Sequence, residues 1–384
     1  MQKKKVLFLI GNLSGGGAEK VLSTLVKYMD KSRFDVRVCC IRDEGKYRDE
    51  VRRTPSVTYS YLLADERTLR GRWEHWAWNL KYCLIHIPYL FRHVYRFLLP
   101  KGFDVEVAFL EDLSTKLISY STNQNSKKIA WVHANLYVMH WNARFYKKSH
   151  DEIAAYRRFD KVIGVSEEVC DSIRALYFED ERTNRVLMLR NPIDSGDIRR
   201  RGGEGPRLER KRQFRLVSVG RLEPAKAFMR LLHIVSRLCR DGYSVELWLL
   251  GEGKERGMLE EYIGQEQLEE YVTLWGFQDN PYSYVAQCDI FVCSSLTEGY
   301  SMAVTEAIIL GLPVVTTDCA GMADLLQNGA GLITENSEEA LEQGLRTVLD
   351  HPDLLEEYKA KTVERGKDFT IEVLMKPIEE LFLH

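Results

Sequence analysis

Two glutamates, Glu298 and Glu306, are separated by seven residues in the segment SSLTEGYSMAVTEAIILGLPVV, residues 294–315. An apolar strand is expected at 290–293 and a helix from about Ser301, so the first glutamate falls in a loop and the second within the helix. A carboxylate accepts two hydrogen bonds and therefore suits the vicinal hydroxyls of a sugar. One glutamate would hold a ribose diol and the other a hexose diol. The alternative, a helix-capping acid and an exposed helix charge, fits these two residues equally well.

The start of the same helix is expected to bind an anion. Backbone amides in the first turn of a helix lack partners within it and favour negative charge. The residues at this point are Gly299, Tyr300, Ser301, Met302 and Ala303. A phosphate bound there would have one glutamate on either side.

Two cations follow an earlier strand. The strand expected at 216–219 ends on Gly220, and Arg221 and Lys226 come next, just before a helix. An arginine binds phosphate oxygens as a planar fork and a lysine acts as a point charge, so the pair suits a diphosphate. A solvated surface pair is the alternative, but the position after a strand favours the phosphate site.

Three glycines, Gly15, Gly16 and Gly17, lie between the first apolar strand and a helix expected from about Ala18. Glycine lets the backbone approach a ligand closely, and a helix start favours an anion. The spacing is not G-x-G-x-x-G, so a tight turn without a ligand is an equally good interpretation. The same departure counts against a nicotinamide dehydrogenase.

The bulk composition is typical of a soluble globular protein. Its 384 residues exceed the usual size of one hydrophobic core, so two domains are expected. The 54 Lys and Arg nearly balance the 56 Asp and Glu, so net charge does not indicate a nucleic-acid partner. The eight cysteines lack C-x-x-C or zinc-type spacing and predict free thiols in a reducing compartment, the cytoplasm. No apolar run of about 18 residues occurs, so no segment is expected to span a membrane.

Short apolar runs alternate with helical segments in two series, which is typical of parallel sheets covered on both faces. After the first strand, the expected strands of the first series are FDVRVCCI, FDVEVAFL, KKIAWVHA and KVIGVSEEV. Those of the second series are RLVSVG, SVELWLLG, VTLWG, IFVCSS, LPVVTT and AGLITE. The predicted fold class is therefore α/β, with two Rossmann-like, doubly wound domains.

The domain boundaries follow from the composition of the connecting segments. We expect an N-terminal domain at 1–195, a linker at 196–212 rich in Arg, Gly and Pro, and a C-terminal domain at 213–369. A last helix, 370–384, ends the chain. A ligand is expected in the cleft between the carboxyl ends of the two sheets.

Four stretches together resemble the retaining glycosyltransferases of family 4, which have the GT-B fold, with two such domains facing a central cleft. They are GGGAEKVLSTL, VGRLEPAKAFMRLL, LLGEGKERGMLEEYI and the stretch from WGFQDNPYSYVAQCDIF through both glutamates to GMADLL. The resemblance covers nearly the whole second domain in order, and the first domain more loosely. The two glutamates following G-R-L-x-x-x-K are its most specific feature.

The resemblance implies a role for each charged residue of the second domain. Arg221 and Lys226 would bind the diphosphate of a nucleotide sugar and stabilise charge on the leaving phosphate. Glu306 would bind the ribose hydroxyls and Glu298 the donor hexose. The amides at 300–303 would complete the phosphate site.

The remaining implied contacts come from both domains. Gly251 and Phe277 would flank the base, and Gly16 of the first domain would close over the diphosphate. His133 matches the family's histidine beside the donor sugar, although a strand-end histidine bonded to the backbone is the alternative. The terminal helix would cross back to the first domain.

The implied reaction is the transfer of a hexosyl group from a nucleotide diphosphate sugar to an acceptor hydroxyl, with retention of configuration. Family frequency suggests a UDP-sugar, and a lipid-linked or polysaccharide precursor as acceptor. No D-x-D motif lies in a suitable loop, so neither a metal nor another cofactor is expected.

The alternatives are a GT-B sugar-nucleotide epimerase and a non-catalytic sugar-nucleotide-binding protein. Two departures from the family, Ala227 for a common Gly and Met229 for a common Asp, concern helix packing more than chemistry.

Residues 70–101 combine aromatic and basic side chains. They are Trp73, Trp76, Trp78, Tyr89, Phe91, Tyr95 and Phe97 with Arg70, Arg72, Lys81, Arg92, Arg96 and Lys101, against the single acid Glu74. Such residues favour peripheral contact with an anionic membrane, here the inner face of the cell membrane. Two amphipathic helices packed on the first sheet and broken at Pro88 are the alternative. A glycan or glycolipid acceptor at a membrane favours the first interpretation.

Overall fold

The computed structural model describes residues 2–87, 90–138, 140–179 and 184–384. The chain forms two compact units, which we call the first unit, Met1–Ile193 with Ile371–His384, and the second unit, Asp194–Thr370. Each is a parallel α/β unit, so the predicted fold class is confirmed. No helix among the described residues combines the length and apolar character needed to cross a bilayer.

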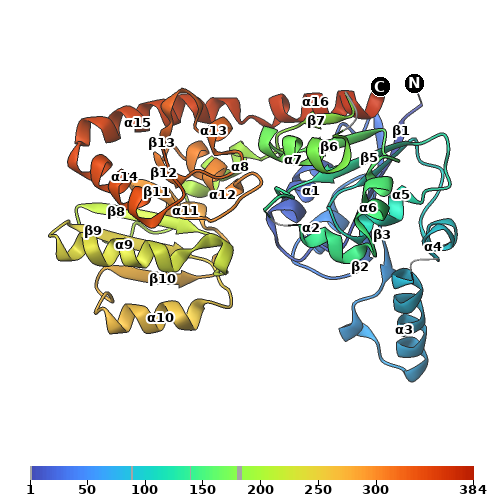
Figure 1. Cartoon of the computed structure of the whole chain (residues 1–384), viewed down its shortest axis with the longest axis horizontal. Coiled ribbons are helices and arrows are strands. Elements are labelled where there is room, and N and C mark those ends of the chain that lie inside the picture. Colours follow the sequence, from blue (N-terminus) through green and yellow to red (C-terminus); the bar gives the residue numbers. More distant parts are fainter. Residues whose placement is uncertain (1, 88–89, 139, 180–183) are drawn as a thin grey trace. The chain divides into compact units, whose positions relative to one another are not determined.

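Within the described residues of the first unit, seven parallel strands form one sheet in the order β3-β2-β1-β4-β5-β6-β7. The strands are β1 (Lys4–Ile10), β2 (Phe34–Arg42), β3 (Val57–Leu63), β4 (Val105–Ala108), β5 (Lys127–Val132), β6 (Lys161–Gly164) and β7 (Val186–Met188). All five residues from Val6 to Ile10 are fully buried, because helices cover both faces of the sheet (Figure 1). This burial explains why the central strand has no polar alternation.

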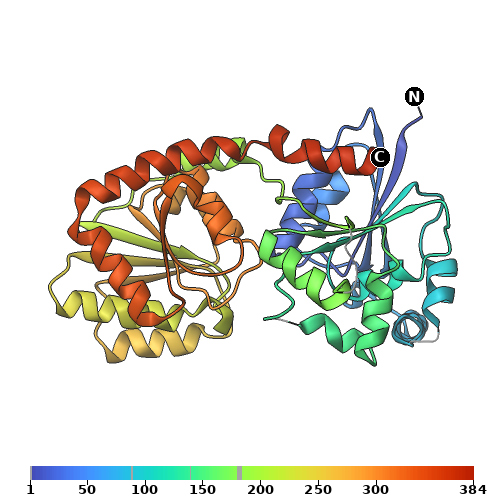
Figure 2. The ribbon, with the colours of Figure 1, turned by 45° about the horizontal axis from the view of Figure 1, so that its top comes forward.

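The helices of the first unit are α1 (Gly17–Tyr28), α2 (Arg48–Arg53), α3 (Arg72–His86), α4 (Phe91–Leu98), α5 (Leu113–Ser119), α6 (Ser149–Tyr156), α7 (Glu167–Tyr177) and α16 (Ile371–Leu383). The chain end returns to this unit through α16, drawn in red along it in Figure 2. Phe382 of α16 packs edge-on against Phe8 and Phe34, with ring centroids 5.8 and 6.2 Å apart. Glu379 accepts a hydrogen bond from the backbone of Asp30 at 2.7 Å.

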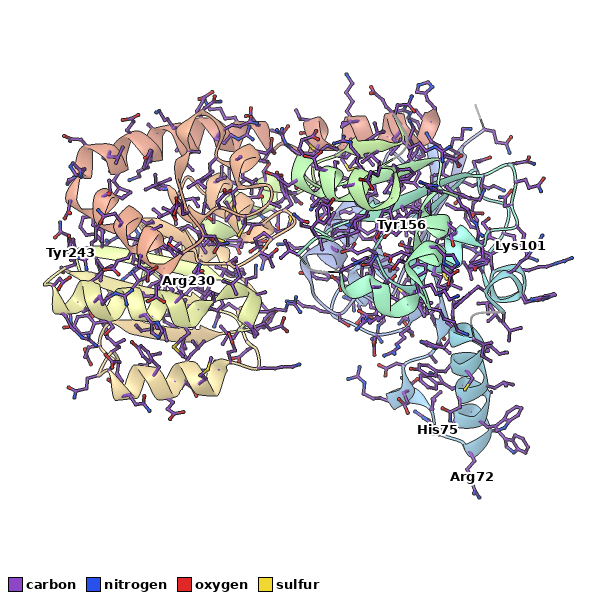
Figure 3. The ribbon with its side chains drawn as sticks, viewed as in Figure 1. Arg72, His75, Lys101, Tyr156, Arg230 and Tyr243 are labelled. Carbon is purple, nitrogen blue, oxygen red and sulfur yellow. The ribbon has the colours of Figure 1, made fainter. Side chains whose placement is uncertain are left out.

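The segment 70–101 divides between core and surface. Phe91 and Tyr95 of α4 are buried, so these two aromatic residues are not available at a surface. Trp73, Trp76 and Phe97 are exposed by 81%, 59% and 71%. Helix α3 projects from the body of the first unit, and Figure 3 shows Arg72 and His75 at its outer end. Pro88 and Tyr89 lie outside the described residues.

In the second unit, every residue of which is described, six parallel strands form a sheet in the order β10-β9-β8-β11-β12-β13. They are β8 (Phe214–Val219), β9 (Val245–Leu250), β10 (Val272–Gly276), β11 (Ile290–Cys293), β12 (Val314–Thr317) and β13 (Gly331–Thr334). The helices are α8 (Ser195–Gly202), α9 (Phe228–Arg240), α10 (Arg256–Gln265), α11 (Tyr282–Val285), α12 (Met302–Ile309), α13 (Met322–Leu325), α14 (Glu338–Asp350) and α15 (Pro352–Arg365). Helix α9 buries Leu231, Leu232 and Val235 in the core.

The stretch 196–212, expected to be a linker, lies within the second unit. Its first part is α8, where Arg199 donates to the backbone oxygen of Gly366 at 2.8 Å. Its second part is held by Arg210, which contacts Asp289 at 2.5 Å. Arg199, Arg201 and Arg210 of this stretch are therefore hydrogen-bonded to other elements of this unit.

Candidate active site

The strand order of the second unit reverses between β8 and β11. Neighbouring parallel strands whose connections leave in opposite directions open a crevice at their carboxyl ends, where ligands bind in open α/β sheets. Gly220 follows β8 and Ser294 follows β11 at this point. The two motifs that the sequence separates by about 70 residues thus lie side by side.

The loop after β8 delivers Lys226. It contains a short 3-10 turn, Pro224–Lys226, and Ala227 then starts α9 from the left-handed conformation, with φ 49° and ψ 44°. Two hydrogen bonds tie this loop to the one after β11: Ser294 Oγ donates to the Lys226 oxygen at 2.8 Å, and the Leu296 amide donates to the Ala225 oxygen at 2.8 Å.

Lys226 and Glu298 form an ion pair, with Lys226 Nζ 2.6 Å from Glu298 Oε1. Their side chains are 24% and 11% exposed. Burial has the largest single effect and lowers the pKa of Lys226, but Glu298 and the neighbouring Cys293 together outweigh it, and the pKa is raised above its ordinary value. Lys226 is therefore a fixed cation at neutral pH, lining a small pocket together with Phe228, Phe291 and Cys293.

The predicted anion-binding helix start is α12, which begins at Met302 after the N-cap Ser301. The Ser301 hydroxyl accepts from the Val304 amide at 3.5 Å. The cap is therefore this serine and not Glu298, which removes the capping interpretation of that glutamate. The amides expected to bind a phosphate, 300–303, precede the one that the cap occupies.

Glu306 lies one turn into α12, where Oε1 is 3.5 Å from the hydroxyl of the buried Tyr282. Gly251 and Phe277 follow β9 and β10 on the same edge of the sheet. Gly251 has φ +138°, and a Cβ there would lie 1.8 Å from the Gly220 oxygen, so only glycine fits. The Phe277 side chain is 57% exposed.

Arg221 is the most exposed of the predicted charged residues. Its side chain is 70% exposed and lies 3.3 Å from Glu223. Its charge is close enough to Lys226 to oppose the protonation of that lysine. An exposed arginine held by one carboxylate is free to turn toward a ligand, at the cost of side-chain entropy.

In the first unit, the glycine loop after β1 leads into α1. Gly15 has φ +121°, a conformation that favours glycine. Gly16 is the N-cap of α1, and a Cβ there would lie 2.4 Å from Glu19 Oε2. Gly17 is the first residue of the helix. The backbone conformation therefore favours glycine at position 15, whereas at position 16 the close neighbour is the movable end of the Glu19 side chain.

His133 directly follows β5 in the first unit. Its ring lies 5.1 Å from the Phe109 ring and nearly parallel to the Trp131 ring. The His133 amide donates to Glu111 Oε2 at 2.9 Å. Burial lowers the pKa of the imidazole to about 3, so it is neutral at physiological pH.

Asp112, which the sequence motifs do not single out, lies on the same edge. It caps α5, accepting from the Ser114 amide at 2.7 Å. A Cβ on Gly11 would lie 2.4 Å from Asp112 Oδ2, so this glycine allows the carboxyl to pack against β1. Burial raises the pKa of Asp112 to about 6.

The sequence also leaves out Ser295 and Tyr282, which contact the two glutamates. A signal for Ser295 exists, because two serines directly follow a buried strand and precede Glu298. Tyr282 lies 24 residues before its partner, and no periodic pattern connects the two. In the described part of the chain, no three His, Cys, Asp or Glu side chains are grouped closely enough to hold a metal ion.

Two family models match the chain. One, described as glycosyl transferases group 1, matches residues 205–368, and the other, described as glycosyltransferase family 4, matches residues 15–196. Together they account for most of the chain and meet near the boundary between the two units. The protein belongs to the family 4 glycosyltransferases, retaining enzymes with the GT-B fold. This membership identifies a glycosyltransferase among the enzyme and non-enzyme alternatives that the motifs alone leave open.

One similar protein matches over nearly its full length. The N-acetylgalactosamine-N,N'-diacetylbacillosaminyl-diphospho-undecaprenol 4-alpha-N-acetylgalactosaminyltransferase of Campylobacter jejuni is 27% identical, over 95% of this chain and 96% of its own length. HepE from Anabaena, solved with UDP and glucose, superposes with a TM-score of 0.74 at 17% identity, covering 99% of both chains. The sucrose-phosphate synthase of Thermosynechococcus elongatus superposes with a TM-score of 0.75 at 16% identity, covering 99% of this chain and 98% of that one. These two structures support the fold.

Proposed function

We propose that the enzyme transfers a hexosyl group from a UDP-sugar to a hydroxyl of a lipid-linked or polysaccharide precursor, with retention of configuration. The observation that carries this proposal is the Lys226–Glu298 pair at the switch point of the second sheet. A cation and a carboxylate 2.6 Å apart match the two parts of such a donor, a diphosphate and a polyol. HepE was solved with UDP and glucose, and the Campylobacter relative is named for a diphospho-undecaprenol-linked acceptor.

In this proposal, each residue acts on one part of the donor. Lys226 and Arg221 bind the diphosphate and stabilise the charge that develops on it as the bond to the sugar C1 breaks. Glu306 binds the ribose, and Glu298 binds a hydroxyl of the hexose. Fixed charges that need no reorganisation during the reaction are an effective form of catalysis.

The acceptor attacks C1 on the face that the leaving group departs from. The C1–O bond to the diphosphate breaks, a new C1–O bond to the acceptor forms, and the acceptor proton passes to the leaving phosphate oxygen. The ion pair with Lys226 reduces the nucleophilicity of the Glu298 carboxylate, which disfavours a double displacement through this residue.

The test is a panel of nucleotide sugars with isolated lipid-linked and oligosaccharide acceptors. We expect UDP release that depends on the acceptor, and a product whose anomeric configuration matches that of the donor by NMR. Epimerised free sugar nucleotide without acceptor transfer would contradict the proposal.

We also propose that the exposed part of 70–101 contacts an anionic bilayer, where a lipid-linked acceptor would lie. Trp73 and Trp76 of α3 and Phe97 of α4 are exposed aromatic residues. The basic residues Arg70, Arg72, Lys81, Arg92, Arg96 and Lys101 are exposed as well. The only acid in 70–101, Glu74, is occupied by accepting from the Arg70 amide at 2.7 Å. Each added basic residue near an anionic leaflet contributes about 1 kcal/mol of attraction.

Sedimentation with vesicles tests this contact. We expect binding to phosphatidylcholine vesicles that contain phosphatidylglycerol, lost at high salt and lost in Arg92→Glu/Arg96→Glu. The control is Lys359→Glu/Lys361→Glu, the same charge change at two exposed residues of the second unit. No sedimentation of wild type at low salt, or equal loss in the control, would contradict the membrane contact and leave the transferase proposal standing.

A further inference from the structure

One oxygen of the Glu298 carboxylate accepts from three donors. Lys226 Nζ donates to Oε1 at 2.6 Å and Ser295 Oγ donates to it at 2.7 Å, and Cys293 Sγ is a longer, weaker donor at 4.0 Å. Among the hydrogen bonds of the described residues, none involves Glu298 Oε2. A carboxylate oxygen has two lone pairs, so Oε1 has no capacity left for a ligand. The glutamate therefore offers a sugar one oxygen and not the pair that the sequence alone suggests.

Ser295 is itself fixed in place. The residue is 2% exposed, and its backbone oxygen accepts from Thr317 Oγ1 at 2.6 Å and from Cys319 Sγ at 3.2 Å. Both donors lie at the end of β12, the strand next to β11. The serine hydroxyl therefore has a defined position relative to the sheet.

We infer that Ser295 is a positioning residue that shares Oε1 of Glu298 with Lys226 and so keeps Oε2 available to a single hydroxyl of the donor sugar. The inference rests on the proposed function and deepens it. Without the serine, the carboxylate is free to turn and present both oxygens to the ammonium. Lys226 has three N–H donors and gives one to Oε1, so a second bond to Glu298 would remove a donor from the diphosphate.

The chain supplies a matched control. Ser294 is a serine of the same buried pair, but its hydroxyl donates to the Lys226 backbone oxygen and not to Glu298. Removing the Ser294 hydroxyl deletes one hydrogen bond at a buried position. Removing the Ser295 hydroxyl deletes the bond to Glu298 and also the longer bond that it accepts from Cys293 Sγ at 3.4 Å. Only the loss of the Ser295 hydroxyl is expected to act through the carboxylate.

A double-mutant cycle tests the inference. Wild type, Ser295→Ala, Glu298→Ala and the double variant are compared in transfer kcat/KM and in UDP affinity. We expect Ser295→Ala to lower kcat/KM about 10- to 100-fold in the wild-type background, the value of one hydrogen bond to a charged group, and less than about twofold in Glu298→Ala. Ser295→Thr keeps the hydroxyl and should recover most of the loss. Ser294→Ala should cost the same in both backgrounds.

A second readout needs no activity. Urea unfolding of the same four proteins should show that the losses from Ser295→Ala and Glu298→Ala are not additive, because the residues share one hydrogen bond. Equal losses of kcat/KM from Ser295→Ala in both backgrounds, or additive unfolding, would overturn the positioning role. If wild type transfers no sugar, the proposed function fails, and the unfolding cycle still decides whether the contact exists.

Discussion

The carboxyl edges of the two sheets hold their ionisable groups in opposite ways. In the second unit, Lys226 and Glu298 are paired at 2.6 Å, and the pKa of the lysine is raised despite burial. In the first unit, burial dominates: it lowers the pKa of His133 to about 3 and raises that of Asp112 to about 6. A partner therefore stabilises the charged form of Lys226, whereas burial disfavours the charged forms of His133 and Asp112.

The difference shows what a partner does for a buried group. Desolvation disfavours the charged form of any side chain, and a close opposite charge reverses that effect. Lys226 has such a partner, whereas His133 lies between aromatic rings. We therefore expect Lys226 to stabilise the charge of a leaving diphosphate in the second unit.

The largest expected effect comes from removing the positive charge of Lys226 in the second unit. Lys226→Ala should lower turnover by about two to three orders of magnitude, the loss expected for one preorganised charge donor. The measurement is steady-state transfer with a saturating donor. The control is Lys359→Ala, an exposed lysine of α15 that is 3.7 Å from Glu356. Turnover within twofold of wild type in a folded Lys226→Ala protein would contradict the role given to Lys226.

Substitutions of Glu306 and Glu298 should have different effects on UDP affinity and on sugar transfer. Glu306→Ala is expected to weaken UDP binding about 10- to 100-fold, since it removes a charged acceptor for ribose hydroxyls. Glu298→Ala should leave UDP affinity within about threefold of wild type, because it frees Lys226, while impairing transfer. Calorimetry with UDP measures both. Equal UDP affinities in the two variants would show that the proposed division of roles is wrong.

The sequence predicts the second sheet better than the first, for a physical reason. Every strand from β8 to β13 matches an expected apolar run, because strands covered on both faces have continuous apolar sequences. β3 and β7 are not among the expected strands. β3, VTYSYLL, is a partly exposed edge strand rich in Tyr, Thr and Ser, and β7 has three residues. Edge strands carry the weakest periodic signal, so the first unit is predicted less completely.

In the candidate site, the sequence likewise predicts some features and misses others. Lys226 and Glu298 are identifiable from motif spacing, and the strand order brings them together. The motif cannot show that they form an ion pair, or that Ser295 holds the same oxygen, because these contacts depend on side-chain geometry across two loops. The α4 aromatic residues show the converse problem: composition alone cannot separate the buried Tyr95 from the exposed Phe97.

The lowered pKa of His133 predicts a pH dependence of the free energy of unfolding. The unfolded histidine binds a proton as pH falls below about 6.5, but native His133, with a pKa of about 3, does not. At this group the unfolded state then binds more protons, so the contribution of His133 to stability falls with acidification between these values, by about 1 kcal/mol per pH unit. His133→Phe lacks this loss. As the pH falls from 6.5 to 4.5, the free energy of unfolding of His133→Phe minus that of wild type should therefore increase by about 1 kcal/mol per pH unit.

Denaturant unfolding at several pH values checks this slope. His133→Gln also lacks the titrating group and should show the same pH-dependent difference, whatever its absolute stability. Asp112 acts in the opposite direction below pH 6, because its raised pKa makes the native state bind the extra proton, so the comparison must be made between variant and wild type. Parallel stability curves for wild type and both variants would contradict a depressed pKa.

The smallest expected effect concerns the backbone conformation of Ala227, the residue after Lys226. Ala227, which stands where many family members have Gly, has φ 49°, and a left-handed conformation costs a residue with a Cβ about 1 to 2 kcal/mol. Glycine removes that cost but loses more conformational entropy on folding, so Ala227→Gly should stabilise the protein by about 0.5 to 1 kcal/mol. The control is Ala225→Gly in the preceding turn, which lacks a positive φ and should destabilise by a similar amount. Urea unfolding measures both variants. Destabilisation by both would mean that the wild-type loop carries no strain at Ala227, and that this departure from the family has no energetic consequence for the position of Lys226.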